Sequence, residues 1–298
     1  MLKIEHVSKS IGGKKILEDI SMELQPGMIH GLIGENGAGK TTLIQCLVGI
    51  YKQDEGSIQL DGQGIYENNM AKMKIGYVAD RNQYFNHYKV SEMVGLFKEV
   101  YPKFSEEKFH TYNETLKLTL NTKVKNLSKG MQMRLALMLN LASRPELLVL
   151  DEPTSGLDAL AKKQVLDFII EAAEEEQMMV VISSHHLSEI ERICDEITML
   201  SHGKMFYQSS VDELKQRVRK LQVVFKDKVP DNLDKWQEVL KVEHIGSVYY
   251  IVTNEYSKAL EDKLNEAGAF LIEAIGLNLE EVFIYTSLSE KIQEKQVI

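Results

Sequence analysis

Apolar and polar residues alternate over the first part of the chain with the period of two that half-buried β-strands show. This alternation predicts strands at residues 2–7 and 16–24, and a short apolar strand follows at residues 28–33. From Thr41 the apolar residues recur with a helical period, which predicts a helix that ends near Gly49. A glycine-rich loop therefore lies between a strand and the start of a helix.

Strands and helices alternate along the following part of the chain. The same patterns predict strands at residues 56–61, 74–78, 147–150 and 179–183, and a hairpin made of residues 197–200 and 205–207. They predict helices over residues 90–120, 127–142, 160–176 and 187–194, the first of them interrupted at Pro102. Because residues 147–150 are apolar throughout, we expect this strand in a parallel sheet that is buried on both faces. The expected fold class is α/β.

The chain changes character after about residue 215, where a charged helix gives way to a different order of elements. The pattern there predicts strands at residues 221–225, 248–253 and 270–273, with a helix over residues 257–267. We therefore expect two domains: a large α/β domain over residues 1–215, and a small α+β accessory domain over residues 216–298.

The glycine-rich loop carries the first candidate chemistry. Its sequence from Gly34 to Thr41 fits G-x-x-x-x-G-K-[ST], with a strand before it and a helix after it. Glycines allow successive backbone N–H groups to surround a phosphate, and the helix start adds its positive dipole end. Lys40 can reach the β- and γ-phosphates, and the hydroxyl of Thr41 can ligate Mg²⁺. The predicted nucleotide contacts are Gly34, Asn36, Gly37, Ala38, Gly39, Lys40, Thr41 and Thr42.

A second candidate element is the apolar strand at residues 147–150, which ends in Asp151 and Glu152. A carboxylate at the end of a buried strand suits a Mg²⁺ contact, which we assign to Asp151. The neighbouring Glu152 is placed to orient or deprotonate an attacking water molecule. Together with the phosphate loop, this strand end predicts hydrolysis of a nucleotide such as ATP, with Mg²⁺ as the metal.

Composition and charge narrow the partners. With 44% hydrophobic and 27% charged residues, the 298-residue chain has the composition of a globular protein. Its formal net charge of −9 provides no basic surplus, so we expect no nucleic-acid partner. Cys46 and Cys194 have no metal-ligand spacing, and we expect buried thiols in a reducing compartment. The N-terminal residues do not resemble a signal peptide, and no run approaches the roughly 20 apolar residues of a membrane span.

Three further segments complete a recognisable order. Leu127-Ser128-Lys129-Gly130-Met131 opens a predicted helix, Pro-Thr-Ser-Gly-Leu-Asp at residues 153–158 follows the carboxylate pair, and Ser183-Ser184-His185 follows the next strand. With the two elements above, this order resembles the ATPase subunits of ABC transporters, over residues 1–215. The resemblance implies a P-loop NTPase fold with an antiparallel β subdomain and a helical insertion at about residues 88–140.

The resemblance also implies roles and partners. His185 would contact the γ-phosphate, Ser128 and Gly130 would bind the γ-phosphate held by an opposing subunit, and Asp158 would lie at the dimer centre. Two subunits would thus hold ATP head to tail, as a homodimer or as a heterodimer with a second ABC ATPase. Polytopic membrane subunits would provide the path for the cargo, and this chain would be cytoplasmic and attached to the inner face of the cell membrane through them.

The sequence departs from the family pattern at three places. Ile11 stands where an aromatic residue commonly stacks on adenine, which predicts weaker selection of ATP over GTP. Asp80 stands where a glutamine follows the strand at residues 74–78, and a carboxylate there can still ligate Mg²⁺ and contribute to catalysis. The alternative at this position is Gln83. Lys129 and Met131 replace a glycine and a glutamine of the family signature.

Two more segments bear on the kind of transporter. The aromatic-rich residues 83–88 are either a small core under a loop or a socket for a cytoplasmic helix of the membrane subunit. The end of the chain, near residues 279–283, resembles the tail of ABC-2 type exporter ATPases from Gram-positive bacteria. This implies export of amphipathic peptides, antibiotics or other hydrophobic compounds. The alternatives are a soluble ABC ATPase without a transport role and an ATP-sensing regulatory subunit.

Overall fold

The computed structural model describes residues 1–80, 86–226 and 228–285, and it divides the chain into two compact units. The first unit comprises Met1–Gln208 and the second Ser209–Ile298. The division thus falls just before helix α8 (Val211–Arg217), whereas the sequence pattern suggested a boundary after about residue 215. Ser210 caps this helix by accepting a hydrogen bond from the backbone N–H of Glu213. The second unit therefore begins with the start of a helix.

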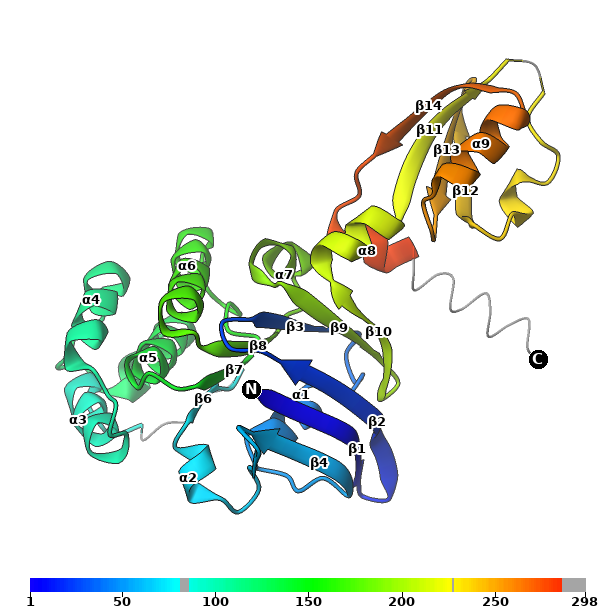
Figure 1. The fold of residues 1–298 in the computed structure, drawn as a ribbon. Helices are drawn as coiled ribbons and strands as arrows, with labels where there is room; N and C mark the ends of the chain where they lie inside the picture. Colours follow the sequence, from blue (N-terminus) through cyan, green and yellow to red (C-terminus); the bar gives the residue numbers. More distant parts are fainter. Residues whose placement is uncertain (81–85, 227, 286–298) are drawn as a thin grey trace. The chain divides into compact units, whose positions relative to one another are not determined.

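A six-stranded sheet forms the centre of the first unit (Figure 1). Its order is β10-β9-β3-β8-β7-β6, from β10 (Lys204–Ser210), β9 (Glu196–Ser201), β3 (Ile29–Ile33), β8 (Met179–Ser183), β7 (Leu147–Asp151) and β6 (Ile75–Val78). The pairings of β3 with β8 and β9, and of β7 with β6 and β8, are all parallel. Every residue of β3, β7 and β8 is buried, which confirms the parallel, doubly covered sheet predicted from the apolar strand.

A second sheet of the first unit has the order β2-β1-β4-β5. It consists of β1 (Leu2–Ile11), β2 (Lys14–Leu24), β4 (Glu55–Leu60) and β5 (Gln63–Gly64), and its pairings are antiparallel. Helix α1 (Lys40–Leu47) buries Leu43, Ile44 and Leu47 in one core cluster with residues from both sheets. This shared core fixes the start of α1, and hence the glycine-rich loop, against the central sheet.

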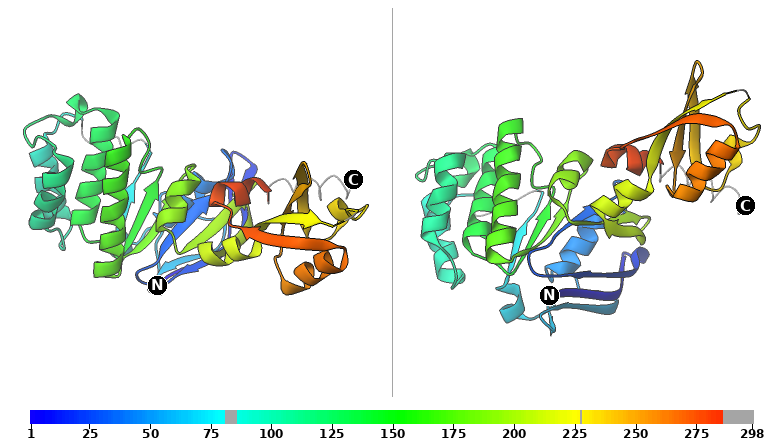
Figure 2. Two further views of the ribbon diagram at one scale, coloured as in Figure 1. Left: turned by 90° about the horizontal axis from the view of Figure 1, so that it is seen from above. Right: turned by 45° about the horizontal axis from the view of Figure 1, so that its top comes forward.

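Apart from the short helix α2 (Asn69–Lys72), the remaining helices of the first unit either lie against the central sheet or pack on helices that do (Figures 1 and 2). They are α3 (Val90–Val100), α4 (Glu106–Leu116), α5 (Lys129–Ala142), α6 (Ala159–Glu176) and α7 (Leu187–Ile193), with a 3₁₀ turn at Val124–Asn126. The predicted interruption near Pro102 is confirmed, because one helix ends at Val100 and the next begins at Glu106, capped by Ser105. The helix predicted from residue 127 begins instead at Lys129, because Ser128 is extended and caps it.

The second unit is built around one antiparallel sheet with the order β12-β13-β11-β14. Its strands are β11 (Arg219–Phe225), β12 (Val239–Ile245), β13 (Val248–Thr253) and β14 (Ala269–Ile275), with a 3₁₀ turn at Leu233–Lys235 and helix α9 (Lys258–Glu266). Leu260 and Leu264 of α9 pack on Leu221, Val223 and Ile251 of the sheet. The unit is α+β as predicted. The sequence pattern missed β12, whose last three residues, 243–245, are exposed.

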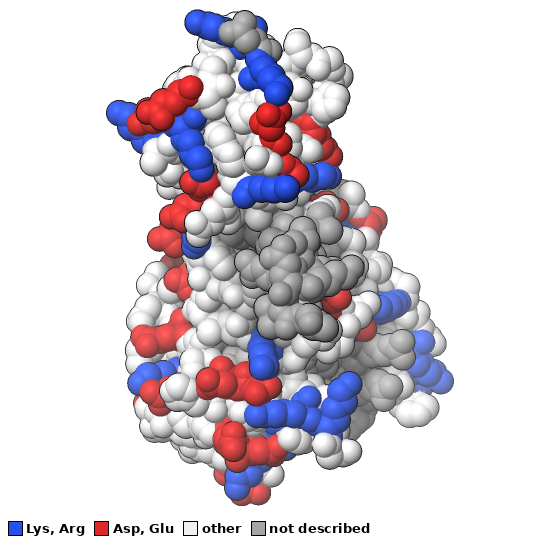
Figure 3. Space-filling model, turned by 90° about the vertical axis from the view of Figure 1, so that its right-hand side faces the viewer, with Lys and Arg blue, Asp and Glu red and all other residues white. Residues whose placement is uncertain are grey.

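Acidic and basic side chains are intermixed among the described residues of the face drawn in Figure 3. In the described part of the chain, no helix combines the length and the hydrophobicity that a membrane span requires. Both cysteines, Cys46 and Cys194, are free and buried, as expected from their spacing.

Candidate active site

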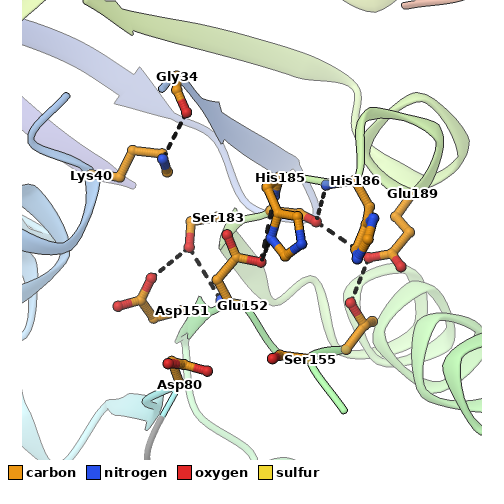
Figure 4. A network of polar contacts seen from close by, with 12 residues as sticks. Gly34, Lys40, Asp80, Asp151, Glu152, Ser155, Ser183, His185, His186 and Glu189 are labelled. Carbon is orange, nitrogen blue, oxygen red and sulfur yellow. Dashed lines mark hydrogen bonds and ion pairs between the residues drawn. The ribbon is translucent and has the colours of Figure 1, made fainter. Parts of the chain in front are cut away.

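The candidate site lies at the carboxyl ends of the parallel strands. Gly34 follows β3, Asp80 follows β6, Glu152 follows β7 and His185 follows β8, so four loops meet at one edge of the sheet (Figure 4). A pocket of about 450 Å³ opens there. Its lining consists of Lys14, Ile16, Asn36, Gly37, Gly39, Lys40, Thr41, Thr42, Asp80, Asp151 and Glu152. The structure therefore brings together residues that are far apart in the sequence.

The glycine-rich loop wraps tightly around the start of α1. Gly39 has a φ of 108°, and a Cβ there would lie 2.8 Å from Cδ2 of Leu17. A Cβ on Gly34 would lie 2.4 Å from the carbonyl oxygen of Leu200. Glycine is therefore required at both positions, and the start of α1 lines the pocket through Gly39, Lys40, Thr41 and Thr42.

Lys40 is the cation inside this loop. Its side chain is buried, and Nζ donates hydrogen bonds to the carbonyl oxygens of Gly34 at 2.7 Å and Glu35 at 3.2 Å. Burial lowers the pKa of Lys40, while the nearby carboxylates of Glu152 and Asp151 act in the opposite direction. The ammonium group is thus held by neutral carbonyls, for which an anionic phosphate would be a stronger partner.

Asp151 is fixed by the neighbouring strand. It pairs with Ser183 across β7 and β8, and Oγ of Ser183 donates a hydrogen bond of 2.6 Å to Oδ1 of Asp151. The hydroxyl of Thr41 and the carboxylates of Asp151 and Asp80 line the same pocket. Hard oxygen ligands of this kind suit Mg²⁺, which binds through few protein groups and the phosphates of its nucleotide. These residues therefore fit the metal, although no group of three His, Cys, Asp or Glu among the described residues forms a metal cage.

Glu152 has an unusual backbone conformation, with a φ of 54°. Its N–H donates to the carbonyl oxygen of Ser183 at 3.1 Å and lies 3.2 Å from the hydroxyl of the same residue. This geometry directs the side chain toward His185, whose Nδ1 lies 2.6 Å from Oε2 of Glu152 (Figure 4). Such left-handed backbone at a non-glycine residue is costly and is enriched at functional sites.

The predicted signature residues lie outside this pocket. Ser128 caps α5 by accepting a hydrogen bond of 3.3 Å from the N–H of Met131. Gly130 packs closely on the loop after Glu152, since a Cβ there would lie 3.0 Å from the carbonyl oxygen of Gly156. The pocket of this chain therefore does not include Ser128 or Gly130 among its lining residues.

Two positively charged side chains of α5 connect the signature helix to neighbouring loops. Nζ of Lys129 lies 3.3 Å from Oδ1 of Asp80 and 3.2 Å from Oγ of Ser155. Arg134 forms an ion pair of 3.2 Å with Asp158, which also caps α6. The N–H of Ala161 is the main cause of the lowered pKa of Asp158. Two departures from the family pattern, Asp80 and Lys129, are thus in contact with each other.

The predicted adenine contact, Ile11, is not among the residues that line the pocket, whereas Asp80 is. Ile11 is exposed at the end of β1 and pairs with Lys14, while the apolar residue among the pocket's lining is Ile16. Gln83, the alternative to Asp80, lies outside the described residues, as do residues 84 and 85 of the aromatic segment at residues 83–88. Asp80 itself lines the pocket.

Sequence reasoning missed the part of Ser183 in holding Asp151, and it missed Glu189 altogether. The first could be found from the sequence, because equivalent positions at the ends of neighbouring parallel strands face each other. Glu189 sits on a helix that reads as solvent-exposed, yet it is buried against three hydrogen-bond donors. No pattern in the sequence predicts that Glu189 is buried against these donors.

The chain matches known proteins over nearly all of its length. A family model described as ABC transporter matches residues 17–155. The ABC transporter ATP-binding protein YtrB of Bacillus subtilis is 32% identical over 95% of this chain and 97% of its own length.

Other matches span less of the chain. The bacitracin transport ATP-binding protein BcrA of Bacillus licheniformis is 32% identical over 74% of this chain and 73% of its own. A probable sulfate/thiosulfate import ATP-binding protein, CysA, of Chlorella vulgaris is 35% identical over 71% of this chain and 92% of its own. Among solved structures, the ATP binding subunit of an ABC transporter matches with a TM-score of 0.67 and 24% identity, over 72% of this chain and 92% of that one.

The fold agrees with these matches, and the range matched by the family model includes the phosphate loop and the two carboxylates at the end of β7. YtrB, which matches almost the whole chain at 32% identity, shows the family of this chain. The predicted ABC ATPase fold is confirmed by the solved cassette. This chain belongs to the ABC transporter family and is an ATP-binding subunit that binds and hydrolyses ATP.

Proposed function

We propose that this subunit powers export of amphipathic peptides, antibiotics or other hydrophobic compounds. The observation that carries the proposal is the similarity to a protein whose name states bacitracin as the compound transported. The sulfate/thiosulfate import protein matches this chain over 216 residues, and the bacitracin transport protein matches it over 223. Because the two matches are of similar length, they do not distinguish import from export. The α+β second unit, which resembles the tail of exporter ATPases, favours export.

We further propose a head-to-tail dimer, either of two copies or with a second ABC ATPase. The start of α5, capped by Ser128, is a second helix N-terminus suited to a phosphate. It contributes nothing to the lining of the pocket in its own chain. A second subunit could present its Ser128 and Gly130 to the nucleotide held here, with Asp158 near the centre. Loss of the γ-phosphate on hydrolysis would then loosen the dimer.

Within each site, the proposed roles follow from the side chains. Glu152 accepts the proton of the attacking water, and His185 positions Glu152 and contacts the γ-phosphate. Lys40 binds the phosphates, while Thr41 and Asp151 hold Mg²⁺, with Asp80 as a further contact to the metal or to its water. When bound, Mg²⁺ would neutralise charge that develops on the phosphate oxygens. The same pocket would admit GTP if adenine is held only by aliphatic contacts.

Membrane subunits with several spans complete the proposed transporter. They would hold this chain at the cytoplasmic face of the membrane, with a helix of the membrane subunit docked near residues 83–88. Purification of the tagged chain from gently solubilised native membranes would then yield a polytopic protein in roughly equal amount. Recovery of the chain without any membrane protein would contradict this assembly.

Reconstitution of that complex in liposomes tests the direction of transport. ATP added outside reaches only those complexes whose ATPase subunits face outward, and these would move an exported cargo into the lumen. We expect fluorescently labelled bacitracin, as a probe peptide, to accumulate inside in an ATP-dependent manner. A Glu152→Gln complex is the matched control. Loss of preloaded peptide from the lumen on addition of ATP would instead indicate import.

A further inference from the structure

Glu189 is a buried carboxylate that no motif accounts for. It lies on α7, and its side chain is only 10% exposed. Oε2 accepts hydrogen bonds from the hydroxyl of Thr154 at 2.6 Å and from that of Ser184 at 3.3 Å, while Oε1 lies 3.0 Å from Nζ of Lys162. Burial of a charge is costly unless it is paired and hydrogen-bonded, and here every donor comes from a different element.

The hydroxyl donors belong to the two loops that carry the proposed catalytic groups. Thr154 follows Glu152 by two residues, and Ser184 directly precedes His185. Both donors are fully buried. Ser184 in turn accepts a hydrogen bond of 3.0 Å from the N–H of His186. Figure 4 shows these contacts running from Glu189 to both loops.

We propose that Glu189 is a positioning residue that sets the geometry between Glu152 and His185. Each of these loops alone has several rotatable bonds, but one carboxylate that binds both removes their independent motion. The 2.6 Å contact between Glu152 and His185 depends on that arrangement. Lys162, on α6, places a positive charge 3.0 Å from Oε1 of the buried carboxylate. The inference rests on the proposed roles of Glu152 and His185.

Glu189→Gln in the purified transporter complex tests the proposal, because glutamine keeps the size of the side chain. The amide presents only one oxygen acceptor and loses the charge toward Lys162. Misplaced catalytic groups typically cost about 10-fold to 100-fold in rate. We expect kcat for ATP to fall by at least about tenfold, with KM for ATP within about twofold, because the phosphate loop is untouched.

The matched control is Asp167→Asn. Asp167 and Arg192 form an exposed ion pair of 2.5 Å that joins the same two helices, α6 and α7, without reaching either catalytic loop. Its loss should leave kcat and KM unchanged. If Asp167→Asn lowers kcat as much as Glu189→Gln does, the effect comes from helix pairing, and the proposal is wrong.

A double variant separates positioning from a general structural role. If Glu189 acts through His185, then Glu189→Gln should add little in a His185→Ala background, where the contact with Glu152 is already lost. If Glu189→Gln lowers kcat by the same factor with and without His185→Ala, the proposal is overturned. Thr154→Val and Ser184→Ala, which each remove one hydroxyl donor, serve if Glu189→Gln does not fold. Unchanged kcat in both would also overturn it.

The Glu152→Gln complex keeps this test distinct from that of the proposed function. Normal ATP turnover by Glu152→Gln would remove the catalytic assignment itself. Lost turnover in Glu152→Gln together with normal turnover in Glu189→Gln would leave the catalytic assignment intact and reject the role of Glu189.

Discussion

The strands of the central sheet have a cleft at their amino ends and a pocket at their carboxyl ends, and the two differ in how their charged groups are paired. At the amino ends of its strands lies a cleft of about 630 Å³, larger than the pocket of about 450 Å³ at the carboxyl ends. The cleft contains many charges, and several of them pair with each other: Lys103 lies 3.2 Å from Glu146, and Arg144 lies 3.1 Å from Glu176. Even the N-terminal amine is paired, with Asp61 at 2.7 Å.

The carboxyl end is arranged differently. Lys40 has carbonyl oxygens as its hydrogen-bond partners within its own loop, and α1 begins at the pocket, where the first N–H groups of a helix have no partner within the helix. The volume of a pocket therefore does not identify the functional end of this sheet. What marks it is a set of polar groups whose partners a ligand can replace.

The largest expected contrast concerns two lysines, one at each end. Lys40→Ala removes a charge-assisted contact of about 2–3 kcal/mol to the phosphates, so ATP affinity should fall by about 30-fold to 150-fold. Lys103→Ala, in the opposite cleft, should leave ATP affinity unchanged. Binding of a fluorescent ATP analogue by both variants checks this. Equal losses of affinity would break the distinction between the two ends.

The second expected contrast concerns stability. Glu176 is largely buried and pairs with both Lys108 and Arg144. Glu176→Gln should therefore lower the free energy of unfolding by about 1 kcal/mol, while ATP turnover at saturation stays the same. Chemical denaturation and an ATPase assay on one preparation measure both quantities. A large loss of turnover without a loss of stability would assign a functional role to the cleft.

The smallest expected effect concerns the pair of Asp80 and Lys129. Both side chains are exposed, so their contact contributes less than about 1 kcal/mol. In the proposed site Asp80 contacts Mg²⁺, so Lys129 would compete with the metal, and Lys129→Met should lower the Mg²⁺ concentration for half-maximal turnover by less than about fivefold. In an Asp80→Asn background, Lys129→Met should have no such effect. A shift of equal size in that background would mean that Lys129 acts elsewhere.

Much of the first unit was predictable because its signals are local. The buried strands have continuous apolar runs, and the loop from Gly34 to Thr41 carries its chemistry in consecutive residues. The strand β7 and the carboxylates after it were predicted at the observed place. Helix starts were less certain by sequence, as the capping role of Ser128 shows for α5.

The contacts between loops were not predictable in the same way. Lys129 meets Asp80 across 49 residues of sequence, and Thr154 meets Glu189 across 35. Asp80 and Lys129 stand out in the sequence as departures from the family pattern, but nothing there indicates that they meet. Thr154 and Glu189 each resemble an ordinary polar residue, and only the folded chain brings the two pairs together. Strand β12 was missed for a related reason, since its charged, exposed outer half hides the alternation that identified other strands.

Turnover of ATP by the Glu152→Gln complex is the most direct test of the central claim, that the carboxyl end of the sheet is the site of hydrolysis and Glu152 its base. Removal of a general base typically costs about 100-fold to 10,000-fold in rate. We predict a loss in this range with ATP binding retained and with a longer-lived ATP-bound dimer. Hydrolysis at the normal rate by the Glu152→Gln complex would contradict the account.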